Sequence, residues 1–151
     1  MKTSSTGFTF IELAVSLSIL GVLAMLAFPM LEHSLRRQKE AALKQALFDI
    51  RTALDAYRAA GQAGVVSAAS ASGYPAGLDE LVNNRDEHGQ RFLRTVPSDP
   101  FSREPDKPAA TTWLLRSYQS PPGSAQPGAD VFDVHSSSSE TGTNGVPYRD
   151  W

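Results

Sequence analysis

An apolar run extends from residue 8 to residue 31, and Glu12 is the only charged side chain in it. A helix needs about 20 residues, at roughly 1.5 Å each, to cross about 30 Å of hydrocarbon, so this run is long enough to span a membrane. An acidic side chain deep in a bilayer costs about 2.5–3.5 kcal/mol. Glu12 therefore needs a partner or a function, and no other charge within the run can supply the partner.

The short polar leader of residues 1–7 indicates where a partner can come from. A cut after Gly7 would place a new, positively charged amine on Phe8, one helical turn before Glu12. In an ordinary secretory signal, the apolar stretch precedes a small-residue cleavage site and is removed with the signal. Here the small-residue boundary lies upstream of the apolar run, so we expect the mature chain to keep residues 8–31 as its anchor.

The motif at residues 7–13, Gly-Phe-Thr-Phe-Ile-Glu-Leu, is followed by an apolar run that contains Pro29. This pattern resembles the class III signal of type IV pilins and of the pseudopilins of type II secretion systems. The resemblance implies that a prepilin peptidase cleaves between Gly7 and Phe8 and methylates the new amine of Phe8. It also implies that Glu12 and Pro29 serve assembly. The alternative is a plain membrane anchor in which Glu12 has no role.

Basic residues near the two ends of the run favour the opposite topology to the one that the resemblance implies. Lys2 precedes the run, whereas four basic residues follow it, namely Arg36, Arg37, Lys39 and Lys44. By the positive-inside tendency, the carboxyl-terminal side would be cytoplasmic. The resemblance implies a single-pass protein of the bacterial inner membrane with a periplasmic head. We follow it because the cleavage motif is the more specific signal.

The helix is expected to continue through residues 32–60 as an amphipathic half. No Gly or Pro occurs between residues 36 and 58, and apolar residues recur there at alternating spacings of four and three. These stripe residues are Leu43, Leu47, Ile50, Leu54 and Tyr57. Gly61 is expected to end the helix, and Pro29 to bend it. The stripe should form half of a small core.

Residues 61–151 are a different kind of polypeptide, rich in Gly, Ser and Pro. They carry seven Lys or Arg and eleven Asp or Glu, so this head is mildly acidic and offers no basic patch for nucleic acid. A short helix is expected at residues 76–82, and strands at residues 111–118 and 130–134. The sequence thus predicts an α+β fold, in which the long helix packs on a small antiparallel sheet as in the pilin-like fold that it resembles.

Features of the head resemble the major pseudopilin of type II secretion: a Tyr74-Pro75 turn, a leucine-rich short helix, and a Pro97-x-Asp99-Pro100 turn before the sheet. The chain has no cysteine, whereas many type IV pilins close a carboxyl-terminal loop with a disulfide. The resemblance implies a structural subunit of a secretion pseudopilus. Its partners would be the prepilin peptidase, copies of itself, minor pseudopilins, and the inner-membrane assembly platform with its cytoplasmic ATPase.

Two other functions stay open at this point. The first is a type IV pilin or minor pilin of an adhesion, motility or DNA-uptake pilus, because the amino-terminal motif serves pili and secretion filaments alike. The second, from a different class, is a membrane-tethered binding module that keeps its leader.

Major pseudopilins often bind calcium in their last loop, and this chain has acidic and polar oxygens in the corresponding region. The candidate ligands are Asp130, Asp133 and Glu140, together with Ser136 and Asn144. Calcium takes six to eight oxygen ligands. The segment departs from the acidic, glycine-rich calcium loop of the family, so the alternative is a solvated serine-rich loop. Tyr148 and Trp151 are expected to pack the tail back onto the head.

Nothing in the sequence favours an enzyme. His33, His88 and His135 are far apart, and none has metal-ligand spacing with another His. Asp133, His135 and the serines that follow could be imagined as a catalytic triad, but a serine run does not hold an oriented base. There is no Gly-rich phosphate loop. We therefore predict a structural protein.

Overall fold

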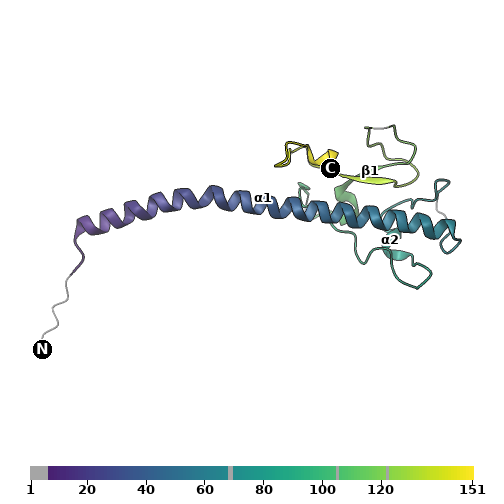
Figure 1. The fold of residues 1–151 in the computed structure, drawn as a ribbon, viewed down its shortest axis with the longest axis horizontal. Coiled ribbons are helices and arrows are strands. Elements are labelled where there is room, and N and C mark those ends of the chain that lie inside the picture. Colours follow the sequence, from purple (N-terminus) through teal and green to yellow (C-terminus); the bar gives the residue numbers. More distant parts are fainter. Residues whose placement is uncertain (1–6, 68–69, 105, 122) are drawn as a thin grey trace, which may run out of the picture. The chain divides into compact units, whose positions relative to one another are not determined.

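The computed structural model describes residues 7–67, 70–104, 106–121 and 123–151, except for the side chains of residues 26–31. Its elements are the helix α1 (Phe10–Gln62), the short helix α2 (Glu80–Asn83), the 3-10 helix η1 (Ala109–Thr112), the strands β1 (Trp113–Arg116) and β2 (Asp133–Ser136), and the 3-10 helix η2 (Tyr148–Asp150). Figure 1 shows them along the chain, from purple at the amino terminus to yellow at the carboxyl terminus.

The chain divides into two compact units, residues 1–38 and residues 39–151. The first unit contains the amino-terminal part of α1, and the second contains the rest of α1 with all the other elements. The predicted end of the helix at Gly61 differs by one residue from the observed end at Gln62. The predicted bend at Pro29 falls within residues 26–31, whose side chains lie outside the described part, and stays a prediction.

The second unit is organised around one face of α1. The five residues of the predicted stripe are all buried, which confirms the helical period read from the sequence. Ala46 and Ala53 complete this face, and their small side chains let the head approach the helix closely. The other buried members of the core are Val66, Tyr74, Leu78, Leu81, Leu93, Trp113, Val131, Val134 and Tyr148.

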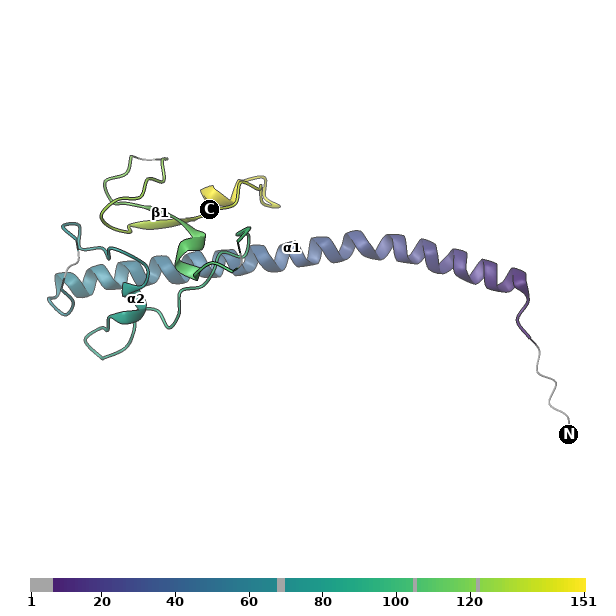
Figure 2. The same ribbon diagram turned by 180° about the vertical axis from the view of Figure 1, so that it is seen from behind.

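Segments of the head lie on two sides of this part of α1. Both ribbon views place β1 and the carboxyl-terminal segment along one side of it and α2 toward the other (Figures 1 and 2). On the α2 side, the Tyr57 hydroxyl donates a hydrogen bond of 2.6 Å to the Glu80 carboxylate. Burial, reinforced by Glu80, raises the pKa of Tyr57. The hydroxyl therefore remains a donor, and this bond fixes α2 against the helix.

β1 and β2 form a two-stranded antiparallel sheet, in which Trp113 pairs with Ser136 and Arg116 pairs with Asp133. Paired side chains in such a sheet share a face. Trp113, Val134 and Ser136 are buried, so their face is the inner one. The expected antiparallel sheet is thus confirmed, and its outer face carries Leu114, Arg116, Asp133 and His135.

The short elements begin later in the chain than expected, because local hydrogen bonds compete with the regular ones. Thr111 and Thr112 form part of η1, where their hydroxyls donate to the carbonyls of Pro108 and Ala109 at 2.8 and 2.7 Å. β2 begins at Asp133 rather than at residue 130, since the Val131 amide donates to the Pro75 carbonyl at 2.8 Å. Similarly, α2 begins at Glu80 rather than at residue 76.

Replacing Ile50 by Ala should destabilise the protein by about 2–5 kcal/mol, because Ile50 is fully buried in the core and the truncation leaves a cavity. The matched control is Phe48→Ala, which removes a larger side chain that is 65% exposed on the same helix and should change stability by less than about 0.5 kcal/mol. Denaturant unfolding of both variants measures the difference. Equal losses would contradict the assignment of the buried face.

Candidate functional site

Gly7 and Phe8 lie before the start of α1, outside any regular element, and both are exposed. A Cβ built on Gly7 meets no atom within 4 Å, and Gly7 is not among the glycines with a positive φ. The described fold therefore does not require glycine at position 7. A requirement for glycine at this position would have to come from a protein that acts on the segment, such as a peptidase that approaches the backbone closely.

Thr9 caps the helix, a role that the sequence analysis missed. Its hydroxyl accepts a hydrogen bond of 3.4 Å from the Glu12 amide, and its carbonyl accepts one of 3.2 Å from the Leu13 amide. The signal was present in the sequence, because Thr-x-x-Glu is a capping pattern. Thr9 thus marks where the helix begins.

Glu12 lies in the first turn of α1 and is exposed. A carboxylate in this position is favoured by the partial positive charge of the helix amino terminus, typically by 0.3–1 kcal/mol. Within the described part of the chain, no side-chain partner of the Glu12 carboxylate is recorded. It is therefore placed to interact with a group outside its own folded chain.

The first part of α1 is apolar on every side. From Phe8, just before the helix, to Met25, the large apolar side chains are all at least half exposed: Phe8, Phe10, Ile11, Leu13, Val15, Leu17, Ile19, Leu20, Val22, Leu23 and Met25. Full burial of each such side chain is worth about 1.5–3 kcal/mol, so this surface strongly favours an apolar environment. Among the residues described, none of the helices combines the length and hydropathy needed to cross a membrane. The predicted span at residues 8–31 includes residues 26–31, whose side chains lie outside that description.

The hydroxyls in this apolar segment are satisfied within the helix. Ser16 donates to the Glu12 carbonyl at 2.7 Å, and Ser18 donates to the Ala14 carbonyl at 2.8 Å. A hydroxyl that bonds to its own helix does not need water, so it tolerates an apolar environment. This leaves the Glu12 carboxylate as the polar group that needs an external partner.

Asp130, a predicted calcium ligand, is buried and fully engaged by protein donors. Its carboxylate accepts hydrogen bonds from the Ser117 hydroxyl at 2.7 Å and the Tyr118 amide at 2.9 Å, and also from the Ser72 hydroxyl. Burial by itself would raise the pKa of Asp130, but the three hydrogen bonds outweigh it and lower the pKa. Asp130 therefore holds the segments around residues 72 and 117 together as a carboxylate.

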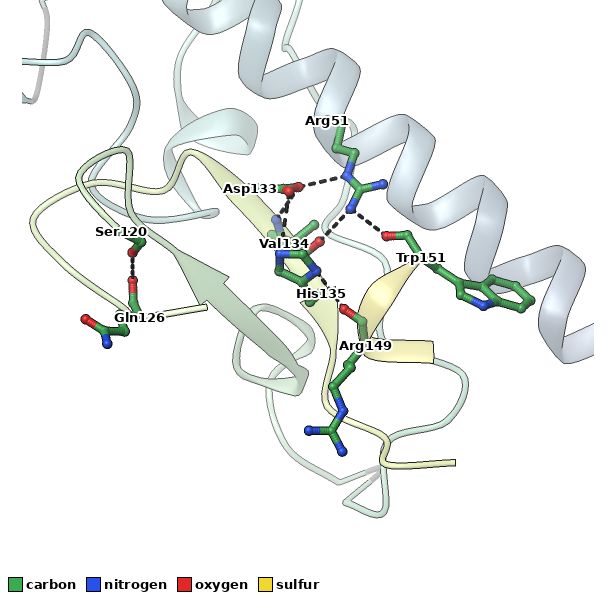
Figure 3. Close-up of polar contacts among 8 residues, drawn as sticks. All are labelled: Arg51, Ser120, Gln126, Asp133, Val134, His135, Arg149 and Trp151. Carbon is green, nitrogen blue, oxygen red and sulfur yellow. Dashed lines mark hydrogen bonds and ion pairs between the residues drawn. The ribbon is translucent and has the colours of Figure 1, made fainter. Parts of the chain in front are cut away.

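The structure does not bring the three predicted acidic ligands together. Asp133 accepts a hydrogen bond of 2.7 Å from Arg51 on α1, as Figure 3 shows, while Glu140 is exposed. The Ser136 hydroxyl is buried and donates to Asp99 at 2.7 Å. Across the described ranges, no group of three His, Asp or Glu side chains is placed to hold a metal ion. The predicted calcium set is thus divided among separate contacts.

Two buried carboxylates bind the last residues of the chain, a role that the sequence analysis did not predict for either of them. Asp99 accepts hydrogen bonds from the Ser136 hydroxyl and from the Ser137 amide at 3.0 Å. Glu40, on α1, accepts from the Thr143 amide at 2.8 Å and the Tyr148 hydroxyl at 2.9 Å. Glu40 could have been found, because it precedes Leu43 by three residues and so lies on the buried stripe.

Tyr148 and Trp151 pack the tail onto the head, as predicted. Tyr148 is fully buried and stacks on Phe101, with 4.0 Å between the ring centroids. Trp151 lies edge-to-face against Tyr148, and the Lys44 ammonium lies 4.7 Å from the Trp151 ring centroid. Arg51 also donates to the backbone oxygen of Trp151 at 2.9 Å, as Figure 3 shows.

Comparison with known proteins bears on the amino-terminal segment. Residues 2–28 match the family model described as the prokaryotic N-terminal methylation motif. The chain matches no curated protein and no solved structure. It carries the N-terminal methylation motif of type IV pilin-like and pseudopilin-like proteins, which are structural subunits that a prepilin peptidase processes. Its long amino-terminal helix and small antiparallel sheet have the pilin-like arrangement.

Replacing Asp130 by Asn should flatten the acid dependence of stability. The pKa of Asp130 in the folded chain lies below its ordinary value of 3.8, so ionised Asp130 stabilises the fold above that pH. This contribution is lost as the pH falls through the lower folded-state pKa. The melting temperature of the variant should be lower than that of the wild type at pH 7, and should fall less on acidification below about pH 4.

The matched control is Glu140→Gln, which neutralises an exposed carboxylate that has no recorded side-chain partner and should leave the melting temperature unchanged. Parallel pH curves for Asp130→Asn and the wild type would show that Asp130 does not contribute as described.

Proposed function

We propose that the chain is a structural subunit of a type II secretion pseudopilus, which a prepilin peptidase releases from its leader and which then polymerises through the first part of α1. The observation that supports this most directly is the methylation motif at residues 2–28, which extends into the part of α1 whose large apolar side chains are exposed. In a bundle of like helices these side chains would stay in an apolar surrounding after leaving the membrane, so their packing against one another would hold the polymer together.

Glu12 and the amine of Phe8 would set the register of the assembly. Cleavage after Gly7 creates the amine, and its methylation leaves the positive charge in place. The Glu12 carboxylate of one subunit would then pair with the Phe8 amine of a neighbour. Opposite charges attract far more strongly in an apolar surrounding than in water, so a mispaired subunit would bury two unpaired charges at a cost of several kcal/mol.

The head favours a secretion pseudopilus over a pilus through the features in which it resembles the major pseudopilin. The Pro75 carbonyl of the Tyr-Pro turn accepts the Val131 amide at 2.8 Å, and Leu78 and Leu81 are buried in the core. The absence of cysteine also supports this reading, since a disulfide-closed tail is impossible. Hydrogen bonds to Glu40 and Asp99 hold the tail instead.

The proposed location is the bacterial inner membrane, where the subunit would lie as a single-pass protein with residues 61–151 in the periplasm before it enters the filament. The proposed partners are the prepilin peptidase, other copies of the chain, minor pseudopilins, and the inner-membrane assembly platform driven by a cytoplasmic ATPase. Pro29 would ease the departure of the helix from the bilayer, because proline removes one backbone hydrogen bond.

Replacing Glu12 by Gln should leave leader removal intact while reducing filament formation at least about tenfold, because the neutral amide cannot neutralise the amine of a neighbouring Phe8. Electron microscopy of sheared filaments from an overexpressing strain measures assembly, and mass spectrometry of the amino terminus measures cleavage. The matched control is Glu32→Gln, which removes another exposed carboxylate of α1 and should assemble normally. Normal filaments from Glu12→Gln would refute the pairing.

Replacing Gly7 by Val should block leader removal without disturbing the fold. A Cβ at this position meets no other atom of the protein within 4 Å, whereas the valine side chain would obstruct a peptidase at the cleavage site. Gly21→Val is the matched control, since Gly21 also has free space around it and lies beyond the cleavage site. The mass of the purified protein reports cleavage. Efficient cleavage of Gly7→Val would contradict this assignment, and an uncleaved wild-type leader would favour the membrane-tethered module.

The alternative of a pilus subunit makes a different genetic prediction. Deletion of the gene should impair export of secreted proteins if the filament belongs to a secretion system. It should instead impair adhesion, motility or DNA uptake if the filament is a pilus. Neighbouring genes for an outer-membrane secretin and other pseudopilins, rather than for retraction machinery, would support the secretion assignment.

A further inference from the structure

The outer face of the sheet forms the floor of a cavity of about 500 Å³. Leu114, Arg116 and His135 come from the two strands, and Arg149 and Asp150 come from η2. The loop residues 123–125 complete the lining. Two arginines thus line one cavity, and Asp150 is the single acidic residue of its described lining. This positive site lies on a head that is otherwise acidic.

Within the described ranges of the chain, no carboxylate is paired with Arg116. Its Nε is buried without a hydrogen-bond partner, and among the described residues its guanidinium makes only a cation–π contact with the Phe132 ring, 5.5 Å from the centroid. Because Nε is inaccessible, a ligand in the cavity would contact Arg116 through the terminal nitrogens of its guanidinium group. An anionic acceptor there would neutralise this charge.

The nearest candidate within the fold is already engaged. Asp133 lies directly opposite Arg116 in the sheet, where an ion pair between the two would be expected. Figure 3 shows that the Asp133 carboxylate turns instead to Arg51, which it binds at 2.7 Å, and it also accepts the Val134 amide at 2.8 Å. The cross-strand partner of Arg116 is thus used to attach β2 to α1.

The walls of the cavity are held by their own hydrogen bonds. His135 Nδ1 lies 2.8 Å from the Arg149 carbonyl, and because a carbonyl can only accept, this nitrogen is the donor (Figure 3). Next to the lining residues 123–125, the Gln126 carbonyl accepts from the Ser120 hydroxyl at 2.6 Å and from the Ser117 amide at 2.9 Å. The cavity is therefore formed before any ligand arrives, which lowers the entropic cost of binding.

We propose that this cavity binds a small organic carboxylate, whose oxygens pair with Arg116 and Arg149. A guanidinium group matches a carboxylate with two parallel hydrogen bonds. The cavity is much larger than an isolated ion, and the half-exposed Leu114 side chain offers its ligand an apolar contact. A carboxylate on a short aliphatic chain satisfies both features. This site is independent of the assembly motif, so it does not rest on the function proposed above.

Titration of the ¹⁵N-labelled full chain in a neutral detergent tests the proposal. Glutarate is the probe, and its neutral diamide is the matched control ligand. Glutarate should shift the side-chain Nε–H signals of Arg116 and Arg149 in a saturable manner, whereas the diamide should bind at least about tenfold more weakly. Equal binding of the two compounds, or no saturable shift with glutarate, would overturn the proposal.

Three variants test which residues of the cavity bind glutarate. Arg116→Gln and Arg149→Gln should each weaken glutarate binding at least about tenfold, and Arg149 is exposed, so its variant tests the site even where Arg116→Gln disturbs the sheet. Asp150→Asn should strengthen binding about threefold, because it removes the one negative charge of the lining.

Arg103→Gln is the control for overall charge, since Arg103 is exposed and does not line the cavity. It should bind glutarate as the wild type does. A loss for Arg103→Gln equal to the loss for Arg149→Gln would show that binding reflects the net charge of the head and would refute the site. Weaker binding by Asp150→Asn would refute it as well.

Discussion

The contact between the buried stripe of α1 and the head is the interaction on which the rest of the structure depends. The sheet has only two strands of four residues each, and an isolated sheet of that size is at best marginally stable in water. Leu43, Ile50 and Tyr57 provide the apolar surface on which it folds. Among the residues that the structure describes, the helix supplies seven of the sixteen in the buried core as one continuous face, and the remaining elements gain their positions from it.

Buried carboxylates link distant segments of this head, as a disulfide or a bound metal does in other small domains. Glu40, Asp99 and Asp130 each accept several hydrogen bonds from segments that are distant in sequence. An ionised acceptor makes stronger hydrogen bonds than a neutral one. These three side chains therefore compensate for a core with little regular structure, and they fix the tail against α1.

The features that could be predicted from the sequence are the local ones. The spacing of the stripe, the cleavage motif and the two-stranded sheet all depend on residues close together along the chain. By contrast, Asp99 and Ser136 or Arg51 and Asp133 are separated by long, irregular segments, and no periodicity connects them. The calcium prediction rested on the family resemblance and on the oxygen-bearing residues of the last loop, and sequence alone does not show that Asp130 and Asp133 each have protein donors. The sequence analysis did not consider Glu40, although its position three residues before Leu43 places it on the stripe and indicates burial.

The two serines that bond to their own helix have a further consequence for the proposed assembly. Moving α1 from lipid into a polymer would exchange one apolar surrounding for another, and Ser16 and Ser18 would keep the same partners throughout. Such a transfer has little intrinsic free-energy difference, so it is reversible in principle. Its direction would then depend on whether the Glu12 carboxylate finds a positively charged partner, so in the proposed assembly this one pairing would favour the polymer over the membrane.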